Sequence, residues 1–244
     1  MKVLLKRLTP GPFLRAFRAR QLRKLREEYG HLSAQDVFTR IYECGAWGKS
    51  SDSSVTYFSG SGSHAGPIVT TYLAAVEQFL ISFVSKPSVA DLGCGDFAIG
   101  ARIRGLCGNY TACDIVPKLI EINRERFADL DVDFRVLDLT TDELPPAEVV
   151  FVRQVLQHLS NEQILRAVPK IQSNYKFLVL TEHLPAFEGF VPNRDHPAGP
   201  GVRLGAESGI VITSAPFSLK VKSERVLCEV GEAGGLIRTT LFEL

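Results

Sequence analysis

Residues 89–100, VADLGCGDFAIG, combine residue types that can hold a ligand closely. An apolar run ends at Asp91, and Gly93 and Gly95 follow at once. Glycine lets the backbone approach a ligand and adopt turns that other residues avoid. The glycines are not followed by the Lys of a phosphate-binding P-loop, and a carboxylate at Asp91 repels phosphate. The stretch therefore predicts a site for a ligand that carries a cationic amino group.

Two further acids follow the next two apolar runs of the chain. Asp114 comes directly after residues 109–113, and Asp138 comes after residues 133–137. In a parallel sheet, ligands bind at the carboxyl ends of the strands, near the point where the strand order reverses. We therefore expect all three carboxylates to serve one site.

These motifs resemble those of class I S-adenosylmethionine-dependent methyltransferases, whose first motif reads D-x-G-C-G-x-G. Their cofactor carries an ammonium and a sulfonium but no phosphate. The resemblance covers about residues 86–182 and includes LDLTTDELP and EVVFVRQVLQHLS, with Phe97 in place of the usual third glycine. It implies S-adenosylmethionine as cofactor, with Asp114 on the ribose hydroxyls and Asp138 on the adenine amino group. The cofactor-binding residues that it implies are Asp91, Gly93, Gly95, Asp114, Ile115, Asp138, Leu139 and Arg153.

Two alternatives stay open at this point. The glycine loop formally fits the G-x-G-x-x-G/A pattern of an NAD-dependent dehydrogenase, although Asp91 disfavours a pyrophosphate beside that turn. A catalytically silent cofactor-binding scaffold, which docks partners through its basic N-terminal tail, would carry the same motifs. Transfer of a labelled methyl group would separate the scaffold from an enzyme.

The elements that position these residues alternate in the manner of a parallel α/β sheet. We expect helices at 12–28, 35–47 and from Pro67 on, and then at 97–106, 117–128 and 161–172. We expect strands at 88–92, 109–113, 133–137, 148–152 and 176–181, followed by a C-terminal hairpin around GEAGG. The predicted fold class is α/β, a Rossmann-like class I methyltransferase sheet that is mostly parallel, with an antiparallel C-terminal strand and an N-terminal helical extension.

The predicted organisation has three parts. Residues 1–30 form a basic helical tail, and residues 31–87 form a helical cap. Residues 88–244 form the methyltransferase domain, in which the Pro- and Gly-rich segment 184–220 is too long for an ordinary connection and is expected to be a substrate lid.

Methyl transfer to a hydroxyl benefits from a general base, and three residues that follow the fourth and fifth strands are candidates: His158, Glu182 and His183. His158 is the leading candidate because imidazole, with an ordinary pKa of about 6.5, keeps a neutral fraction at cytoplasmic pH. His183 is the reserve base, and Asp195 of the lid would orient the imidazole or bind sugar hydroxyls. We expect the acceptor between the turn after the fourth strand and the lid, where it would contact Gln154, Asn193 and Arg203. No Cys/His cluster has metal-ligand spacing, so no metal site is expected.

The expected acceptor is a small molecule or a glycan. The segments IYECGAWG, SGSGS, NRDHPAGP and APFSL resemble a bacterial branch of these methyltransferases, some members of which are associated with polysaccharide biosynthesis. The [DN]PP[YF] signature of exocyclic-amine methylation and the Pro-Cys nucleophile of cytosine methylation are absent from the sequence. The prediction is O-methylation of a sugar or glycan precursor.

Charge divides the chain into two unequal parts. Residues 1–26 contain nine Lys and Arg and no acid, whereas the rest has 19 basic and 27 acidic residues. An acidic body disfavours nucleic acid as a partner. The basic, amphipathic tail predicts docking on an acidic surface such as the inner face of a membrane, or packing on its own domain or on a twin subunit in a homo-oligomer. Five cysteines without a pairing pattern, and no signal peptide, predict a cytoplasmic protein.

Overall fold

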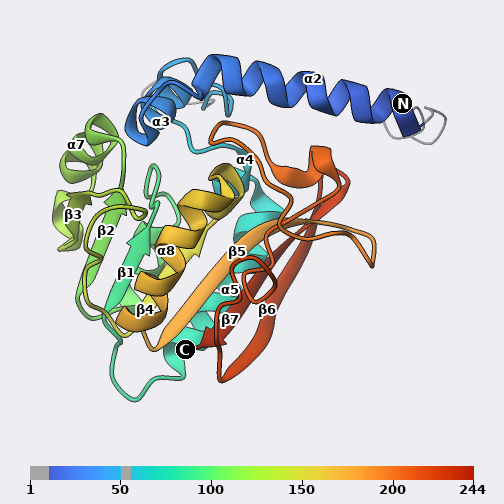
Figure 1. Cartoon of the computed structure of the whole chain (residues 1–244). Helices are drawn as coiled ribbons and strands as arrows, with labels where there is room; N and C mark the ends of the chain where they lie inside the picture. The colour runs from blue at the N-terminus through green and yellow to red at the C-terminus, as the bar shows by residue number, and fades with distance from the viewer. Residues whose placement is uncertain (1–10, 51–55) are drawn as a thin grey trace.

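A seven-stranded sheet forms the centre of the molecule (Figure 1). The computed structural model describes residues 11–50 and 56–244. The strands are β1 (Val89–Leu92), β2 (Tyr110–Asp114), β3 (Asp133–Val136), β4 (Val149–Arg153), β5 (Phe177–Pro185), β6 (Ser223–Glu232) and β7 (Gly235–Glu243). Their order is β3-β2-β1-β4-β5-β7-β6, with β1 to β5 parallel and β7 antiparallel to both of its neighbours. The predicted mostly parallel sheet with an antiparallel C-terminal end is confirmed.

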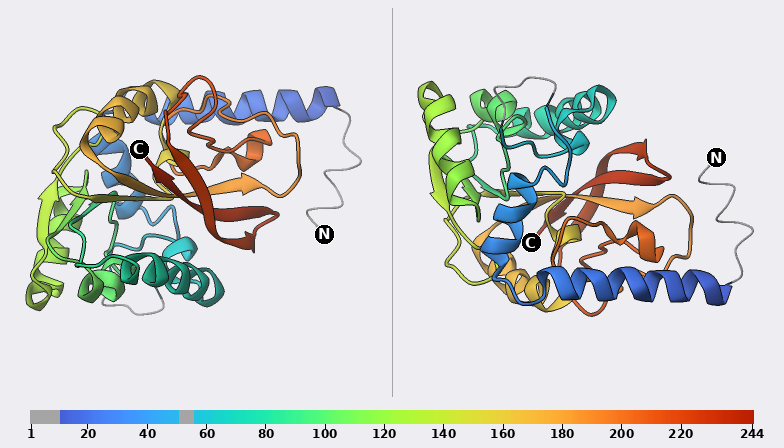
Figure 2. Two further views of the ribbon diagram at one scale, coloured as in Figure 1. Left: turned by 90° about the horizontal axis from the view of Figure 1, so that it is seen from below. Right: turned by 90° about the horizontal axis from the view of Figure 1, so that it is seen from above.

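Both faces of this sheet are covered, which explains its apolar central strands. Every residue of β1 is buried, and the first four residues of β4 are buried as well. Parallel strands that are buried on both faces have such continuous apolar runs. Helix α8 (Asn161–Asn174) covers one face, and helices α5 (Gly66–Ile81) and α6 (Gly100–Ile103) cover the other (Figures 1 and 2). Helix α7 (Pro117–Arg126) lies beside β2 and β3.

The predicted cap of residues 31–87 divides in space. Helix α3 (Ala34–Glu43) lies with α4 (Ser61–His64) at the upper ends of the central strands, whereas α5 packs against the sheet (Figure 1). The side chain of Ser33 caps α3 by accepting a hydrogen bond from the Asp36 backbone nitrogen, 3.1 Å away. This arrangement places the buried face of α3 over the site rather than over the body of the sheet.

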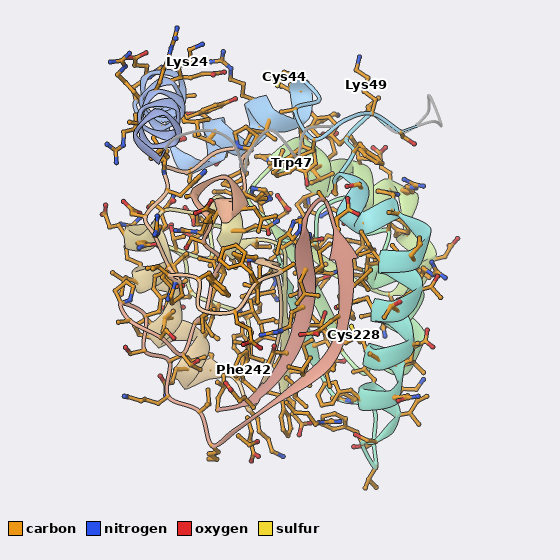
Figure 3. The ribbon with its side chains drawn as sticks, turned by 90° about the vertical axis from the view of Figure 1, so that its right-hand side faces the viewer. Lys24, Cys44, Trp47, Lys49, Cys228 and Phe242 are labelled. Carbon is orange, nitrogen blue, oxygen red and sulfur yellow. The ribbon has the colours of Figure 1, made fainter. Side chains whose placement is uncertain are left out.

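Helix α2 (Gly11–Tyr29) extends across the top of the molecule (Figures 1 and 2). Its C-terminal part packs on the domain, because Tyr29 is buried and Leu25 and Tyr29 lie against Gly199. Arg23 and Lys24 are exposed, and Lys24 projects away from the rest of the molecule (Figure 3). The remainder of the predicted tail, residues 1–10, lies outside the described residues. Within the described part of the chain, no helix has the length and apolar character needed to cross a membrane.

Two regions depart from the predicted elements. The helix expected at 97–106 is reduced to α6 and a 3₁₀ turn at Arg104–Leu106, because the backbone turns at Phe97, where φ is +57°. β5 continues to Pro185, into the segment that was expected to be lid. The rest of the lid is irregular apart from the short turn Arg203–Ala206, and it packs into the core through Ile210, Ile212, Phe217 and Leu219.

Candidate functional site

One cavity of about 360 Å³ opens at the carboxyl ends of the parallel strands. Its floor comes from β1, β2 and β4, on both sides of the point where the strand order reverses. Its roof includes Phe38 and Tyr42 of α3, together with Trp47, which lies below the N-terminal helices (Figure 3). A crevice at this switch point is the expected ligand site of an open α/β sheet. The cavity is lined by all eight predicted cofactor residues: Asp91, Gly93, Gly95, Asp114, Ile115, Asp138, Leu139 and Arg153.

The glycine loop after β1 is held open by its own packing. Gly93 and Gly95 have φ values of +79° and +57°, a region that glycine adopts without strain. A Cβ atom on Gly93 would lie 2.4 Å from a methyl carbon of Val155, and one on Gly95 would lie 2.5 Å from the Ser59 hydroxyl. Both positions therefore require glycine before any ligand is considered.

Phe97 occupies the place of the family's third glycine without disturbing this loop. Its ring is fully buried and packs edge-to-face on Tyr110 and Phe134, with centroids 5.5 and 4.9 Å away. A Cβ atom on Gly100 would lie 2.1 Å from the Phe97 ring. Because Gly100 has no side chain, it leaves room for the Phe97 ring that stands where the family has a glycine.

Two buried carboxylates lie where β1 and β2 end, in the part of the cavity that we call its first half, or cofactor half. Asp91 accepts a hydrogen bond from the Tyr110 hydroxyl at 3.0 Å and forms no ion pair among the described residues. Burial raises the pKa of Asp91 to about 7. Asp114 accepts from the backbone nitrogens of Gly95 and Val116, each at 3.1 Å, and burial raises its pKa to about 6. Both groups gain from a ligand that brings positive charge or donates hydrogen bonds.

Asp138 is the third acid of this half and is more open. Its Oδ1 accepts a hydrogen bond from the Thr140 backbone nitrogen at 2.8 Å, and Leu139 is buried beside it. No described residue donates to its Oδ2. One carboxylate oxygen therefore stays available to an amino group in the cavity.

Arg153, at the end of β4, is the only guanidinium that lines the cavity among the described residues. It lies over the Tyr72 ring, 4.8 Å from the centroid, and donates to the Ser63 hydroxyl at 3.1 Å and to the Gly62 carbonyl. Burial lowers its pKa, and its buried Nε has no described partner. Gln154 follows with φ of +56°, lines the same cavity and presses against Gly62.

His158 lies in the second half of the cavity, the part that it lines together with His183, Pro200 and Val202. Both ring nitrogens of His158 are occupied. Nδ1 donates to the Gly201 carbonyl at 3.1 Å, because a carbonyl oxygen can only accept, and Nε2 accepts from the Gln157 amide at 3.2 Å. Trp47 packs on the ring, 4.9 Å between centroids. Burial lowers the pKa of His158 to about 4, well below the ordinary value on which its expected role as base depended. The ring is built into the wall as a neutral group.

His183, on β5, has the free nitrogen that His158 lacks. Its Nε2 donates to the Glu232 carbonyl at 2.9 Å, which leaves the lone pair of the neutral ring on Nδ1. Among the described residues, Nδ1 has no hydrogen-bond partner, and His183 lines the cavity together with Pro200, Val202 and Ile237. The geometry favours the reserve base over the leading one.

The structure does not bring Asn193, Asp195 or Arg203 to the cavity. The Asn193 amide donates to the Val211 and Ala215 carbonyls, each at 2.9 Å, and its Oδ1 accepts from the Val211 nitrogen at 2.9 Å. Asp195 accepts from the Asn161 backbone nitrogen at the start of α8, 3.0 Å away. Arg203 is buried and donates to the Leu159 carbonyl at 2.5 Å and to the Arg194 carbonyl. These three side chains fasten the lid segment, which reaches the cavity through Pro200 and Val202 instead.

One segment at the site was not among the predicted site residues. Ser59–Ser63 line the cavity, and Asp96 is bound to that segment. A Ser- and Gly-rich run is typical of a surface loop, so the sequence offered no signal that it closes a pocket. Glu182, one of the predicted base candidates, does not line the cavity: it is buried beside Leu156, and burial raises its pKa to about 8.

Comparisons with known proteins agree with this geometry. Residues 89–176 match the family model described as a methyltransferase domain. This part of the chain is a methyltransferase domain. No curated protein matches the sequence. The domain model and the fold together support the predicted cofactor, S-adenosylmethionine, over NAD.

Solved structures similar to this chain show the same fold at low sequence identity. Magnesium protoporphyrin IX methyltransferase of Synechocystis PCC 6803 with bound SAM has a TM-score of 0.55 at 12% identity, covering 87% of this chain and 98% of that one. The DhpI–SAH complex has a TM-score of 0.53 at 16% identity, covering 86% and 95%. The N-methyltransferase NodS of Bradyrhizobium japonicum WM9 in complex with S-adenosyl-L-homocysteine has a TM-score of 0.52 at 14% identity, covering 72% and 87%. At this identity the likeness concerns the fold and not the acceptor.

Proposed function

We propose that this methyltransferase binds S-adenosylmethionine and methylates a hydroxyl oxygen of a sugar or glycan precursor. The observation that carries the proposal is the position of His183 in the cavity, with Nε2 held by the Glu232 carbonyl and Nδ1 free. A hydroxyl acceptor needs such a base, whereas an amine or a carboxylate does not. The family motifs associated with polysaccharide biosynthesis support a sugar as the acceptor.

The residues of the first half of the cavity fit the cofactor. Asp91 is a buried carboxylate without an ion-pair partner in the described chain, which suits an ammonium group. Asp114 can accept from ribose hydroxyls, and the free oxygen of Asp138 can accept from an adenine amino group. The unpaired Nε of Arg153 suits a carboxylate.

When bound, S-adenosylmethionine supplies a methyl group on a sulfonium, and its loss leaves a neutral thioether. The chain has no oxyanion to stabilise, so its main task is to align the two reactants. His183 Nδ1 would take the proton of the acceptor hydroxyl. Trp47 joins the lid segment at the second half of the cavity, because its Nε1 donates to the Pro200 carbonyl at 3.1 Å.

A labelled-methyl assay tests this proposal directly. The purified chain is incubated with methyl-labelled S-adenosylmethionine and with sugar nucleotides, soluble oligosaccharides or cell extract, and the labelled product is identified by mass spectrometry. We expect a methyl ether on a sugar hydroxyl. A labelled amine or carboxylate would contradict the acceptor class, and S-adenosylmethionine binding without any labelled product would favour the scaffold alternative.

We also propose that the N-terminal tail contacts an anionic membrane surface at the cytoplasmic face. The described part of the tail carries exposed Arg20, Arg23 and Lys24, and residues 1–10 add Lys2, Lys6 and Arg7 in sequence. Co-sedimentation of the full chain with vesicles that contain anionic lipid, compared with neutral vesicles, measures this contact. Equal pelleting of the wild type and a variant with Arg20, Arg23 and Lys24 changed to Glu would contradict it, and self-association in place of lipid binding would indicate the homo-oligomer.

A further inference from the structure

A short strap, residues 59–64 (SGSGSH), covers one side of the cofactor half of the cavity. Ser59–Ser63 line the same cavity as Asp91 and the glycine loop. The second part of the strap is the single helical turn α4, near the upper ends of the central strands (Figure 1). A ligand beneath the strap cannot leave on this side unless the strap moves.

The first end of the strap is fastened by Asp96, which follows the second glycine of the ligand loop. The Ser59 backbone nitrogen donates to Asp96 Oδ2 at 3.0 Å, and the Asp96 backbone nitrogen donates to the Ser59 hydroxyl at 2.8 Å. Tyr42 extends this arrangement, because its hydroxyl lies 3.1 Å from the Ser59 hydroxyl. These bonds join the strap to the ligand loop itself.

The other end of the strap is fastened to the same carboxylate by His64. Its Nε2 lies 2.6 Å from Asp96 Oδ2, and its ring stacks on Phe58 with centroids 4.4 Å apart. Bonds from His64 and from the Ser59 and Ala98 backbone nitrogens hold the pKa of Asp96 below its ordinary value despite burial. One buried carboxylate therefore closes both ends of the strap.

Arg153 holds the middle of the strap from below. It donates to the Ser63 hydroxyl at 3.1 Å and to the Gly62 carbonyl. A Cβ atom on Gly62 would lie 2.1 Å from the Gln154 side chain, so the strap lies directly on the end of β4. The strap contains no large apolar residue, and polar contacts with few buried apolar groups are typical of segments that open locally.

We propose that His64 and Asp96 form a latch that holds the strap over the bound cofactor, so that this pair controls how fast the demethylated cofactor leaves. The latch rests on the proposed function, because it acts on the S-adenosylmethionine site. His64 is a positioning residue here. Its side chain is 32% exposed, so the pair can separate without unfolding the core.

The rate at which S-adenosylhomocysteine dissociates from the full chain tests the latch. In His64→Ala the dissociation rate constant, measured by stopped flow, should rise about tenfold, the effect of one hydrogen bond to a charged group. KM for S-adenosylmethionine should rise with it, while kcat stays the same or increases. His64→Gln should restore slow dissociation, because the Gln amide can donate to Asp96 in place of Nε2. This variant lacks the ring that stacks on Phe58, so it tests the hydrogen bond alone. His31→Ala, at an exposed histidine outside the strap, is the matched control.

Amide hydrogen exchange of the ligand-free protein tests the latch independently of cofactor binding. Residues 59–64 should exchange faster in His64→Ala than in the wild type, the Gln variant or the control. Equal exchange in all four proteins, or a Gln variant that behaves like the Ala variant in both measurements, would overturn the latch. A wild type that protects the strap but does not bind S-adenosylhomocysteine would overturn the proposed function and leave the exchange result to decide on the strap.

Discussion

The two halves of the cavity are built from opposite kinds of chemistry. The cofactor half holds the buried carboxylates of Asp91 and Asp114, each with a raised pKa and neither in an ion pair within the described part of the chain. The other half, where we propose that the acceptor binds, holds two imidazoles, His158 and His183, each of which donates from one nitrogen to a backbone carbonyl. The first half therefore gains from positive charge that a ligand brings, whereas in the second half both ring nitrogens of His158 are occupied and His183 has a described partner at Nε2 only. Under the proposed function, recognition of the acceptor would depend on shape and on the free nitrogen of His183.

This difference follows from where each half comes from in the fold. The carboxylates lie in the last two residues of β1 and β2, where the sheet alone determines their positions. The acceptor half is assembled from β5, the hairpin turn at Glu232 and the lid, which meet only after the long segment 186–222 has packed. The sheet alone places a charged residue at the end of a strand, whereas a residue on a loop is placed only by tertiary contacts.

The largest expected effect separates the two imidazoles of the acceptor half. His183→Ala should lower kcat by about 10²–10⁴-fold, the usual loss of a general base, with S-adenosylhomocysteine affinity within a few-fold of wild type. His158→Ala should lower kcat much less, because both nitrogens of that ring are occupied. Steady-state kinetics on the identified acceptor measure both variants. A larger loss in His158→Ala, in a folded protein, would return the role of base to His158.

The next effect concerns the charged half. Asp114→Ala should weaken S-adenosylmethionine binding by about 1.5–3 kcal/mol, the range for hydrogen bonds to a charged group. Isothermal titration calorimetry measures the change. Asp114→Asn is the milder companion variant, because it keeps an acceptor for only one of the Gly95 and Val116 nitrogens, which donate to different oxygens of the carboxylate. Unchanged affinity in both variants, or tighter binding of NAD than of S-adenosylmethionine, would contradict the cofactor assignment.

Asn193 tests whether the lid's polar residues fasten the segment rather than bind the acceptor. Asn193→Ala should lower the free energy of unfolding by about 1–3 kcal/mol, because it leaves partly buried backbone groups of residues 211–215 without their partner, while the acceptor KM stays the same. Chemical denaturation and kinetics measure the two effects, with Asn174→Ala as an exposed control. An increased acceptor KM without loss of stability would place Asn193 in the acceptor site after all.

The smallest effect is a pH dependence with opposite signs for stability and for binding. Asp91, with a pKa of about 7 in the folded chain, is protonated there at pH values at which it ionises in the unfolded chain. The folded state therefore binds more protons, and the Tm of the ligand-free protein should fall as pH rises from about 4 to 7. Cofactor affinity should instead fall below pH 7, by at most about tenfold per pH unit, because an ammonium favours the ionised carboxylate.

Thermal unfolding with and without S-adenosylhomocysteine, repeated in Asp91→Asn, measures this pH dependence. The asparagine variant should lose most of the pH dependence of binding and bind more weakly at pH 8. A variant that keeps the full wild-type pH dependence would show that another group, such as Asp114, is responsible.

Local sequence patterns were sufficient for the sheet and for the cofactor half. The apolar runs that became β1, β2 and β4 lie within a residue or two of their predicted bounds. Asp91 and Asp114 lie in the last two residues of β1 and β2, and Asp138 comes two residues after β3, so a parallel sheet brings all three acids to one edge. The element that differed most was the helix at 97–106, because the sequence pattern did not show that Phe97 would take a left-handed turn and bury its ring beside Gly100.

The sequence by itself thus determined the fold class, the succession of strands along the chain and the acids of the cofactor half. Only the tertiary structure decided which histidine keeps a free nitrogen, which lid residues face inward, and that the SGSGSH segment lies over the cavity. The reason is physical. A strand end is placed by local periodicity and by its neighbour in the sheet, whereas the state of His158 or His183 depends on carbonyls 43 and 49 residues away along the chain. Such long-range partners are set by packing, and no spacing in the sequence encodes them.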